Sequence, residues 1–66
     1  MKQKDIYRSA NLLIEQYQEG ALLEAMKRQI ELRDKGDETG AYYWQKIGDA
    51  ITFFQMPADL HDGNFQ

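Results

Sequence analysis

The chain has 66 residues, enough for one small domain, and a formal net charge of -3 from 8 basic and 11 acidic residues. Because it contains no cysteine, disulfides and thiolate metal sites are excluded, and hydrophobic packing must hold the fold. The acidic balance argues against a nucleic-acid partner, and no apolar run approaches the roughly 18 residues that a membrane span needs.

The first helix is predicted from Asp5 to Gln18, with Asp5 as its N-cap. Its apolar residues recur at helical spacing and form one stripe: Ile6, Ala10, Leu13, Ile14 and Tyr17. Residues 1–5 are charged and Glu15 interrupts the apolar stretch, which is not the pattern of a secretory signal. We therefore expect a cytoplasmic protein with no membrane partner, and the absence of cysteine fits a reducing compartment.

The second helix is predicted over residues 21–35, between Gly20 and Gly36. We expect one apolar stripe to face the core: Leu22, Leu23, Met26 and Ile30. Two acid–base pairs have the favourable i, i+4 order, Glu24 with Arg28 and Glu31 with Lys35.

The third helix is predicted to begin after Asp37, a good N-cap, and to end near Gln55 because Pro57 follows. Its core stripe is expected to comprise Tyr43, Trp44, Ile47, Ala50, Ile51 and Phe54. Gly40 and Gly48 are unfavourable inside a helix, which indicates close approach of a neighbouring helix. The fold class is therefore all-α: a small three-helix bundle over residues 1–56 with antiparallel neighbours, followed by a partly ordered C-terminal tail, 57–66.

Residues 36–51 contain a Gly-Asp turn followed by Ala41, an aromatic run and Ala50-Ile51. This segment resembles the helix–turn–helix junction of a tetratricopeptide repeat, and since the chain has room for fewer than two such units we interpret it as a generic helical hairpin.

A second resemblance covers about residues 5–54. It is carried by Tyr7-Arg8-Ser9-Ala10, Leu12-Leu13-Ile14, Ala25-Met26, Gly36-Asp37, Gly40-Ala41, Trp44 and Ala50-Ile51. This pattern is similar to a family of short, uncharacterised helical proteins from proteobacteria. The first turn departs from the family, which often has Gly-Glu-Asp-Ala where this chain has Gln18-Glu19-Gly20-Ala21. The resemblance implies the helical fold and carries no catalytic residue.

Catalytic and metal-binding patterns are weak in this sequence. His61 is the only histidine and there is no cysteine, so no His-His or Cys-His site can form within one chain. Asp59, His61 and Asp62 are close together but do not match a calcium loop, and the chain lacks a phosphate-binding P-loop. We expect no enzyme activity, no metal and no cofactor.

One basic cluster provides the alternative function, and it consists of Lys27, Arg28, Arg33 and Lys35. These side chains could contact phosphates in a regulator of nucleic-acid transactions, although neighbouring acids neutralise two of them. The acidic residues 36–66 suggest another form of that function, a mobile-element inhibitor that mimics the charge of DNA.

Four apolar residues lie off the predicted stripes: Leu12, Leu32, Tyr42 and Phe53. Tyr42 and Phe53 are three helical turns apart and share one side of the third helix. Three placements are open: a wide core stripe that absorbs them, an exposed patch, or a cover formed by Leu60 and Phe65 of the tail. Our leading hypothesis is the patch, used to bind a protein partner or a second copy of the chain.

Overall fold

The computed structural model describes residues 2–57, and this part of the chain is helical with no strand, which confirms the all-α prediction. The elements are α1 (Gln3–Tyr17), a short 3-10 helix η1 (Gln18–Gly20), α2 (Ala21–Asp34) and α3 (Glu38–Phe54). The predicted contributions of Leu60 and Phe65, and of Asp59, His61 and Asp62, lie outside the described residues.

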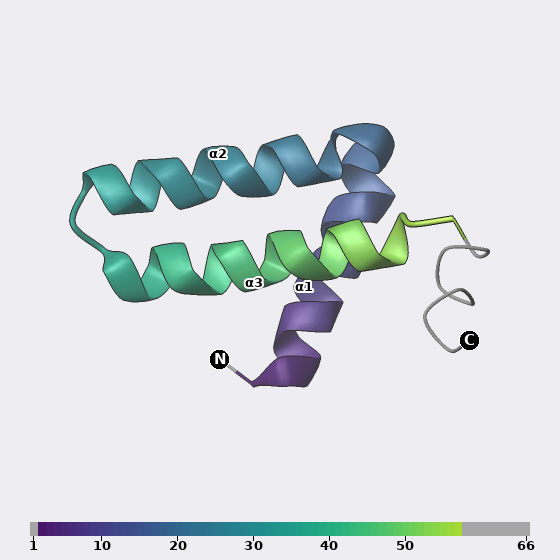
Figure 1. Cartoon of the computed structure of the whole chain (residues 1–66), viewed down its shortest axis with the longest axis horizontal. Coiled ribbons are helices and arrows are strands. Elements are labelled where there is room, and N and C mark those ends of the chain that lie inside the picture. Colours follow the sequence, from purple (N-terminus) through teal and green to yellow (C-terminus); the bar gives the residue numbers. More distant parts are fainter. Residues whose placement is uncertain (1, 58–66) are drawn as a thin grey trace.

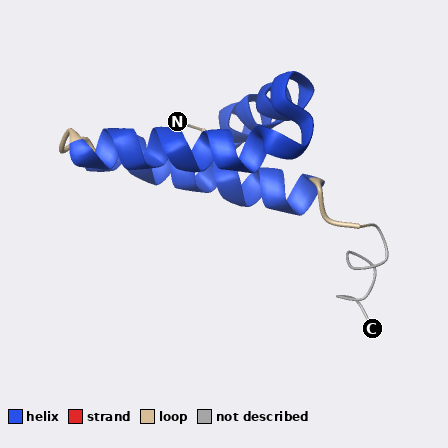
Figure 2. Ribbon diagram, turned by 90° about the horizontal axis from the view of Figure 1, so that it is seen from above, coloured by secondary structure: helices blue, strands red, loops and turns tan. Residues whose placement is uncertain are grey.

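Helices α2 and α3 form an antiparallel hairpin, and α1 crosses it (Figure 1). The turn of the hairpin occupies residues 35–37, and α1 lies at the opposite end, where η1 leads directly into α2. Seen from above, α1 lies on one side of the hairpin instead of running along it (Figure 2). It contacts both α2 and α3 there, so the expected antiparallel arrangement applies to α2 and α3 and not to α1.

The hairpin turn follows the chemistry predicted for it. Gly36 has a φ of 84°, a conformation that only glycine adopts without strain, and it ends α2. Asp37 is then the N-cap of α3, because its Oδ1 accepts a 2.9 Å hydrogen bond from the backbone N–H of Gly40.

The junction of α1 and α2 departs from expectation. α1 begins at Gln3, so Asp5 lies in the first turn, where its charge suits the helix dipole, and does not cap the helix. The positive φ at this junction, 51°, falls on Gln18 instead of Gly20. The carbonyl of Gln18 accepts a 2.7 Å hydrogen bond from Gln55 Nε2, which ties the end of α3 to the end of α1.

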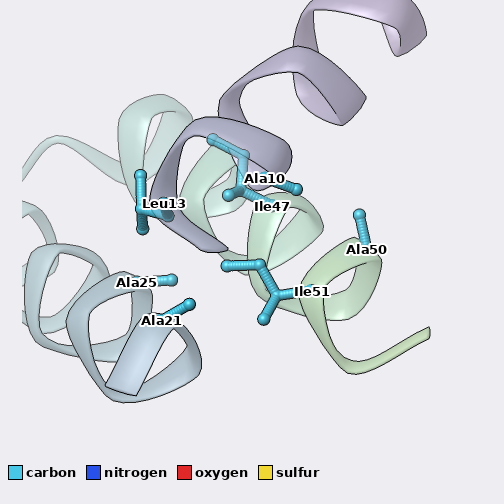
Figure 3. Close-up of a cluster of buried hydrophobic side chains, with 7 residues drawn as sticks. All are labelled: Ala10, Leu13, Ala21, Ala25, Ile47, Ala50 and Ile51. Carbon is cyan, nitrogen blue, oxygen red and sulfur yellow. The ribbon is translucent and has the colours of Figure 1, made fainter. Parts of the chain in front are cut away.

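The core is small and lies where the three helices cross (Figure 3). Ile47 and Ile51 of α3 are its largest fully buried side chains, with 1% and 0% of their surface exposed. The other buried members are a leucine and four alanines: Ala10, Leu13, Ala21, Ala25 and Ala50. Ile6, Ile14, Leu22 and Trp44 pack around them and are partly buried.

The predicted core face of α2 was wrong for three of its four residues. Leu23, Met26 and Ile30 are exposed, and the residues that face the core are Ala21, Ala25 and, in part, Leu22. The reason is the close approach of α3: a Cβ built on Gly48 would lie 3.4 Å from Leu22 Cδ1 and 3.9 Å from Ala25 Cβ. Larger side chains do not fit between the helices at this spacing, so they lie on the other side of α2.

Two further stripe predictions were wrong, because Tyr17 and Phe54 are exposed. Each is at the C-terminal end of its helix, α1 and α3 respectively, and Phe54 contacts Tyr7 instead of the core.

Candidate interaction surfaces

An open groove with a volume of about 620 Å³ lies between α1 and α3. We call it the aromatic groove. Its lining comes from the first two turns of α1 and from one face of α3: Gln3, Ile6, Tyr7, Tyr42, Tyr43, Lys46, Asp49, Ala50 and Phe53. The α3 members recur at three- and four-residue intervals, so the helix presents them on one side.

The rings in and beside the groove contact one another. Tyr7 and Phe54 have ring centroids 5.7 Å apart, and Phe53 lies 6.0 Å from Phe54 at an edge-on angle. At the other end, Tyr42 and Tyr43 are 5.6 Å apart in the same geometry. Edge-on and tilted pairs at these distances are favourable. The aromatic groove is thus lined by rings that support each other and are not isolated on the surface.

Two polar side chains of the groove, Lys46 and Gln3, each contact one of its tyrosines. Lys46 Nζ lies 5.3 Å from the centre of the Tyr42 ring, within range of a cation–π interaction. Gln3 Nε2 donates a 2.7 Å hydrogen bond to the hydroxyl of Tyr7. These contacts restrict the side chains that a ligand would meet and lower the entropy cost of ordering them on binding.

The structure brings together two of the four predicted interface residues. Tyr42 and Phe53 each have 52% of their surface exposed, and both line the aromatic groove. Leu12 is also exposed, but it lies on a shallower surface of α1 with Arg8 and Glu15.

Leu32 does not join this surface. It is partly buried at the hairpin turn, where its Cδ1 lies 3.0 Å from the Cβ position of Gly40. The described residues therefore place Leu32 in the packing between α2 and α3, as the wide-stripe alternative expected.

Sequence reasoning missed Tyr7. It directly follows Ile6 and lies at the edge of the α1 stripe, beside Ile14, so its position on the helix does not distinguish it from a core residue. Which helices would face each other was not readable from the sequence, so Tyr7 and Tyr42 could not be assigned to one groove.

The four predicted basic residues do not form a free patch. Arg28 Nε donates a 3.0 Å hydrogen bond to Glu24 Oε2, and its guanidinium lies 5.0 Å from the centre of the Trp44 ring. Lys27 Nζ is 3.6 Å from the same carboxylate. Arg33 and Lys35 are exposed near the hairpin turn. Lys27 and Arg28 thus share one carboxylate within α2, and no ion pair joins Glu31 to Lys35 in residues 2–57.

Glu24 lies next to two basic side chains, Arg28 and Lys27. Its hydrogen bond from Arg28 holds the pKa of the carboxyl below its ordinary value, with a smaller opposing effect of burial and further lowering by Lys27. The same hydrogen bond raises the pKa of Arg28. This is the chemistry of a structural ion pair within α2, and neither group is set up as a general acid or base.

Catalytic or metal-binding arrangements are not seen in the part of the chain that the structure covers. No group of three or more His, Asp or Glu side chains lies close enough together to hold a metal ion. No buried side-chain nitrogen or oxygen lacks a hydrogen-bond partner there either.

The comparisons with known proteins identify no relative: no family model, no curated protein and no solved structure matches this chain. Among the described helices, none has the length and apolar character required to cross a membrane.

Proposed function

We propose that this chain is a small three-helix bundle that acts in the cytoplasm as a non-enzymatic protein–protein interaction module. Its binding site is the aromatic groove, and its ligand is a segment of another protein that inserts an apolar side chain between α1 and α3. The observation that carries the proposal is the meeting of half-exposed Tyr42 and Phe53 with Tyr7 in one groove.

Residue type supports a protein ligand. Aromatic side chains supply large contact areas with few rotatable bonds, and they dominate the binding energy of protein interfaces. A concave surface lined by Tyr7, Tyr42 and Phe53 suits an apolar anchor residue, while Asp49 adds a charged group to the lining.

The lack of convergent polar groups argues against a small-molecule site. Such sites combine an enclosed apolar cavity with a few polar atoms aimed at the ligand. The aromatic groove is open, and the hydroxyl of Tyr7 and the ammonium of Lys46 are already paired with Gln3 and Tyr42. A protein segment needs only a complementary apolar surface, so it fits this groove better.

A comparative capture experiment tests the proposal. Wild-type protein, Tyr42→Asp and Phe53→Asp are immobilised and exposed to a lysate of the source cells, and retained proteins are quantified by mass spectrometry. We expect at least one protein to be retained by the wild type and reduced at least tenfold by both variants, because each places a charge in the apolar groove. Its dissociation constant, measured with purified components, should follow the same order.

Leu23→Asp is the matched control, since it makes the same change at an exposed residue of α2 outside the groove. It should retain the ligand at the wild-type level. Circular dichroism must show wild-type helicity for all three variants. Equal retention by wild type and Phe53→Asp of every captured protein would overturn the proposal, and so would unfolding of Phe53→Asp, which would assign Phe53 to the core.

A further inference from the structure

One side of α1 carries two cations that have no ion-pair partner within residues 2–57. We call it the α1 surface, and it is lined by Lys4, Tyr7, Arg8, Asn11, Leu12 and Glu15. Lys4 and Arg8 are exposed, and the ion pairs found in the described chain lie within α2. Tyr7 and Leu12 add apolar area, with 42% and 49% of their surfaces exposed. The α1 surface is therefore complementary to a segment with both an apolar and an acidic side chain.

The C-terminal end of α3 lies beside α1 (Figure 1). The ring centroid of Phe54 is 5.7 Å from that of Tyr7, and the side chain of Gln55 donates its hydrogen bond to the carbonyl of Gln18. Leu60 follows Phe54 by six residues, which is at most about 20 Å of extended chain. This length is sufficient for Leu60 to reach the ring of Tyr7.

Residues 58–66, which we call the C-terminal segment, have the charge that complements the α1 surface. They contain two acids, Asp59 and Asp62, and no lysine or arginine. In an extended chain alternate side chains share a side, so Leu60 and Asp62 would face one way, about 7 Å apart, and Asp59 the other. Neighbouring side chains on a helix are separated by a similar distance, about 5–6 Å. One helix surface therefore accommodates Leu60 and Asp62 together.

We propose that the C-terminal segment docks in extended form on the α1 surface. Leu60 packs on the exposed edge of Tyr7. The carboxylate of Asp62 lies between Lys4 and Arg8, which are one helical turn apart on the same side of α1. Because the segment is tethered to α3, its effective concentration is on the order of millimolar, so a few contacts are sufficient to hold it. This docking does not depend on a ligand in the aromatic groove.

The acids of the neighbouring elements are compatible with this placement. Glu15 follows Arg8 by seven residues, about 10 Å along the helix, where salt screens most of its repulsion of the segment. Asp5 lies roughly 60° further round the helix from Arg8. The aromatic groove suits the segment less well, because Asp49 lines it and its cation, Lys46, already lies on a tyrosine ring.

NMR relaxation of the backbone amides of the full chain tests the docking. We expect order parameters above about 0.6 for residues 60–62 in the wild type, and below about 0.6 in Asp62→Asn and in Arg8→Gln. Asp59→Asn is the matched control, since it removes the same charge from the other side of the segment, and it should leave these values unchanged. Wild-type order parameters below about 0.6 would overturn the proposal, and so would an Asp62→Asn segment as ordered as the wild type.

A variant of the aromatic groove separates this proposal from the proposed function. Tyr42→Asp should impair the groove and leave the order parameters of the C-terminal segment unchanged, because Tyr42 does not line the α1 surface. Loss of ligand binding in Tyr42→Asp with an ordered segment would support both proposals. A segment that becomes disordered in Tyr42→Asp would place it in the aromatic groove and overturn its docking on the α1 surface.

A spin label locates the segment directly, because the chain has no cysteine of its own. Gly63→Cys carries the nitroxide on the side of the segment that faces away from α1, the side of Asp59. The label should broaden the amide signals of residues 4–8 more than those of residues 42–46 on α3, and Asp62→Asn should remove this difference. Stronger broadening of residues 42–46 would exclude the α1 surface as the docking site.

Discussion

Helices α2 and α3 divide their apolar residues in opposite ways. In α3 the two isoleucines, Ile47 and Ile51, are fully buried, and its exposed large apolar residues are aromatic. In α2 the alanines Ala21 and Ala25 are inside, and larger side chains such as Ile30 are outside. The two helices lie side by side in one hairpin. The short distance between them leaves room at the contact for the large side chains of only one helix.

The difference shows that helix spacing decides which side chains are buried here. Gly48 and the α2 alanines allow the backbones to approach, and Ile47 and Ile51 then fill the space between α1, α2 and α3. Once that space is filled, a leucine at an alanine position would overpack the core. Apolar residues that do not fit remain outside, where they are available to bind other molecules.

Truncating a buried isoleucine of α3 and an exposed isoleucine of α2 should give the largest difference in the free energy of unfolding. Ile51→Ala should lower the free energy of unfolding by about 2–5 kcal/mol, because it removes a fully buried side chain and leaves a cavity. Ile30→Ala should change the free energy of unfolding of the monomer by less than about 0.5 kcal/mol. Urea denaturation followed by circular dichroism measures both.

The ratio of these two effects is the informative quantity. Equal losses would mean that Ile30 is packed within the monomer, contrary to its exposure. A small loss for Ile51→Ala would mean that the crossing of α1 over the hairpin can collapse around the cavity. Ile51→Val, which removes one methylene, should fall between wild type and Ile51→Ala.

The glycines of α3 should respond to alanine with opposite signs. At Gly48 a new Cβ meets Leu22 Cδ1 at 3.4 Å, an ordinary contact, so Gly48→Ala should raise the free energy of unfolding by about 0.5–1 kcal/mol through helix propensity. At Gly40 it would lie 2.6 Å from Asp37 Oδ2, so Gly40→Ala should lower that free energy by about 1 kcal/mol by displacing the cap.

A double variant checks the cause at Gly40. If the cost arises from the cap, Gly40→Ala should cost little once Asp37→Ala has already removed the side chain that it displaces. Thermal unfolding of the four proteins gives the coupling. Additive effects would instead assign the cost to Leu32, whose Cδ1 lies 3.0 Å from the same position.

Local chemistry made the helices and the hairpin turn predictable. Gly36 and Asp37 act through their own backbone and the next three residues, so no knowledge of the rest of the chain is needed. The end of α3 near Gln55 followed from Pro57 in the same way. The crossing of α1 was not predictable, since a positive φ at Gln18, a residue that rarely adopts it, sets the direction of the chain there.

The face that each helix buries was predictable only where one apolar face exists. For α3 the stripe was right at Ile47, Ala50 and Ile51. α2 has two apolar faces, and hydrophobicity favours the face with Leu23 and Ile30, although close packing selects the alanines. The candidate site shows the same division: Tyr42 and Phe53 were placed correctly off the stripe, while Tyr7 depends on how α1 crosses α3.

The smallest expected effect concerns the polar edge between α2 and α3, where Glu24 holds Arg28 over Trp44. Because the hydrogen bond from Arg28 lowers the pKa of Glu24 in the folded state, that state binds the proton less readily than the unfolded chain. The resulting stabilisation is present above the unfolded pKa and is lost as the pH falls through the folded one. The urea midpoint should therefore fall on acidification below about pH 5, and less in Glu24→Gln.

Arg28→Met separates the ion pair from the packing of the long side chain on Trp44. Methionine keeps an apolar stem over the ring and removes the donor, so this variant should lose most of the pH dependence that Glu24→Gln loses, with Lys27 keeping the remainder. The double variant should lose no more than Glu24→Gln alone. Parallel curves of urea midpoint against pH for wild type and Glu24→Gln would show that the pair adds nothing to stability. The small alanines and Gly48 would then be sufficient to hold α2 against α3.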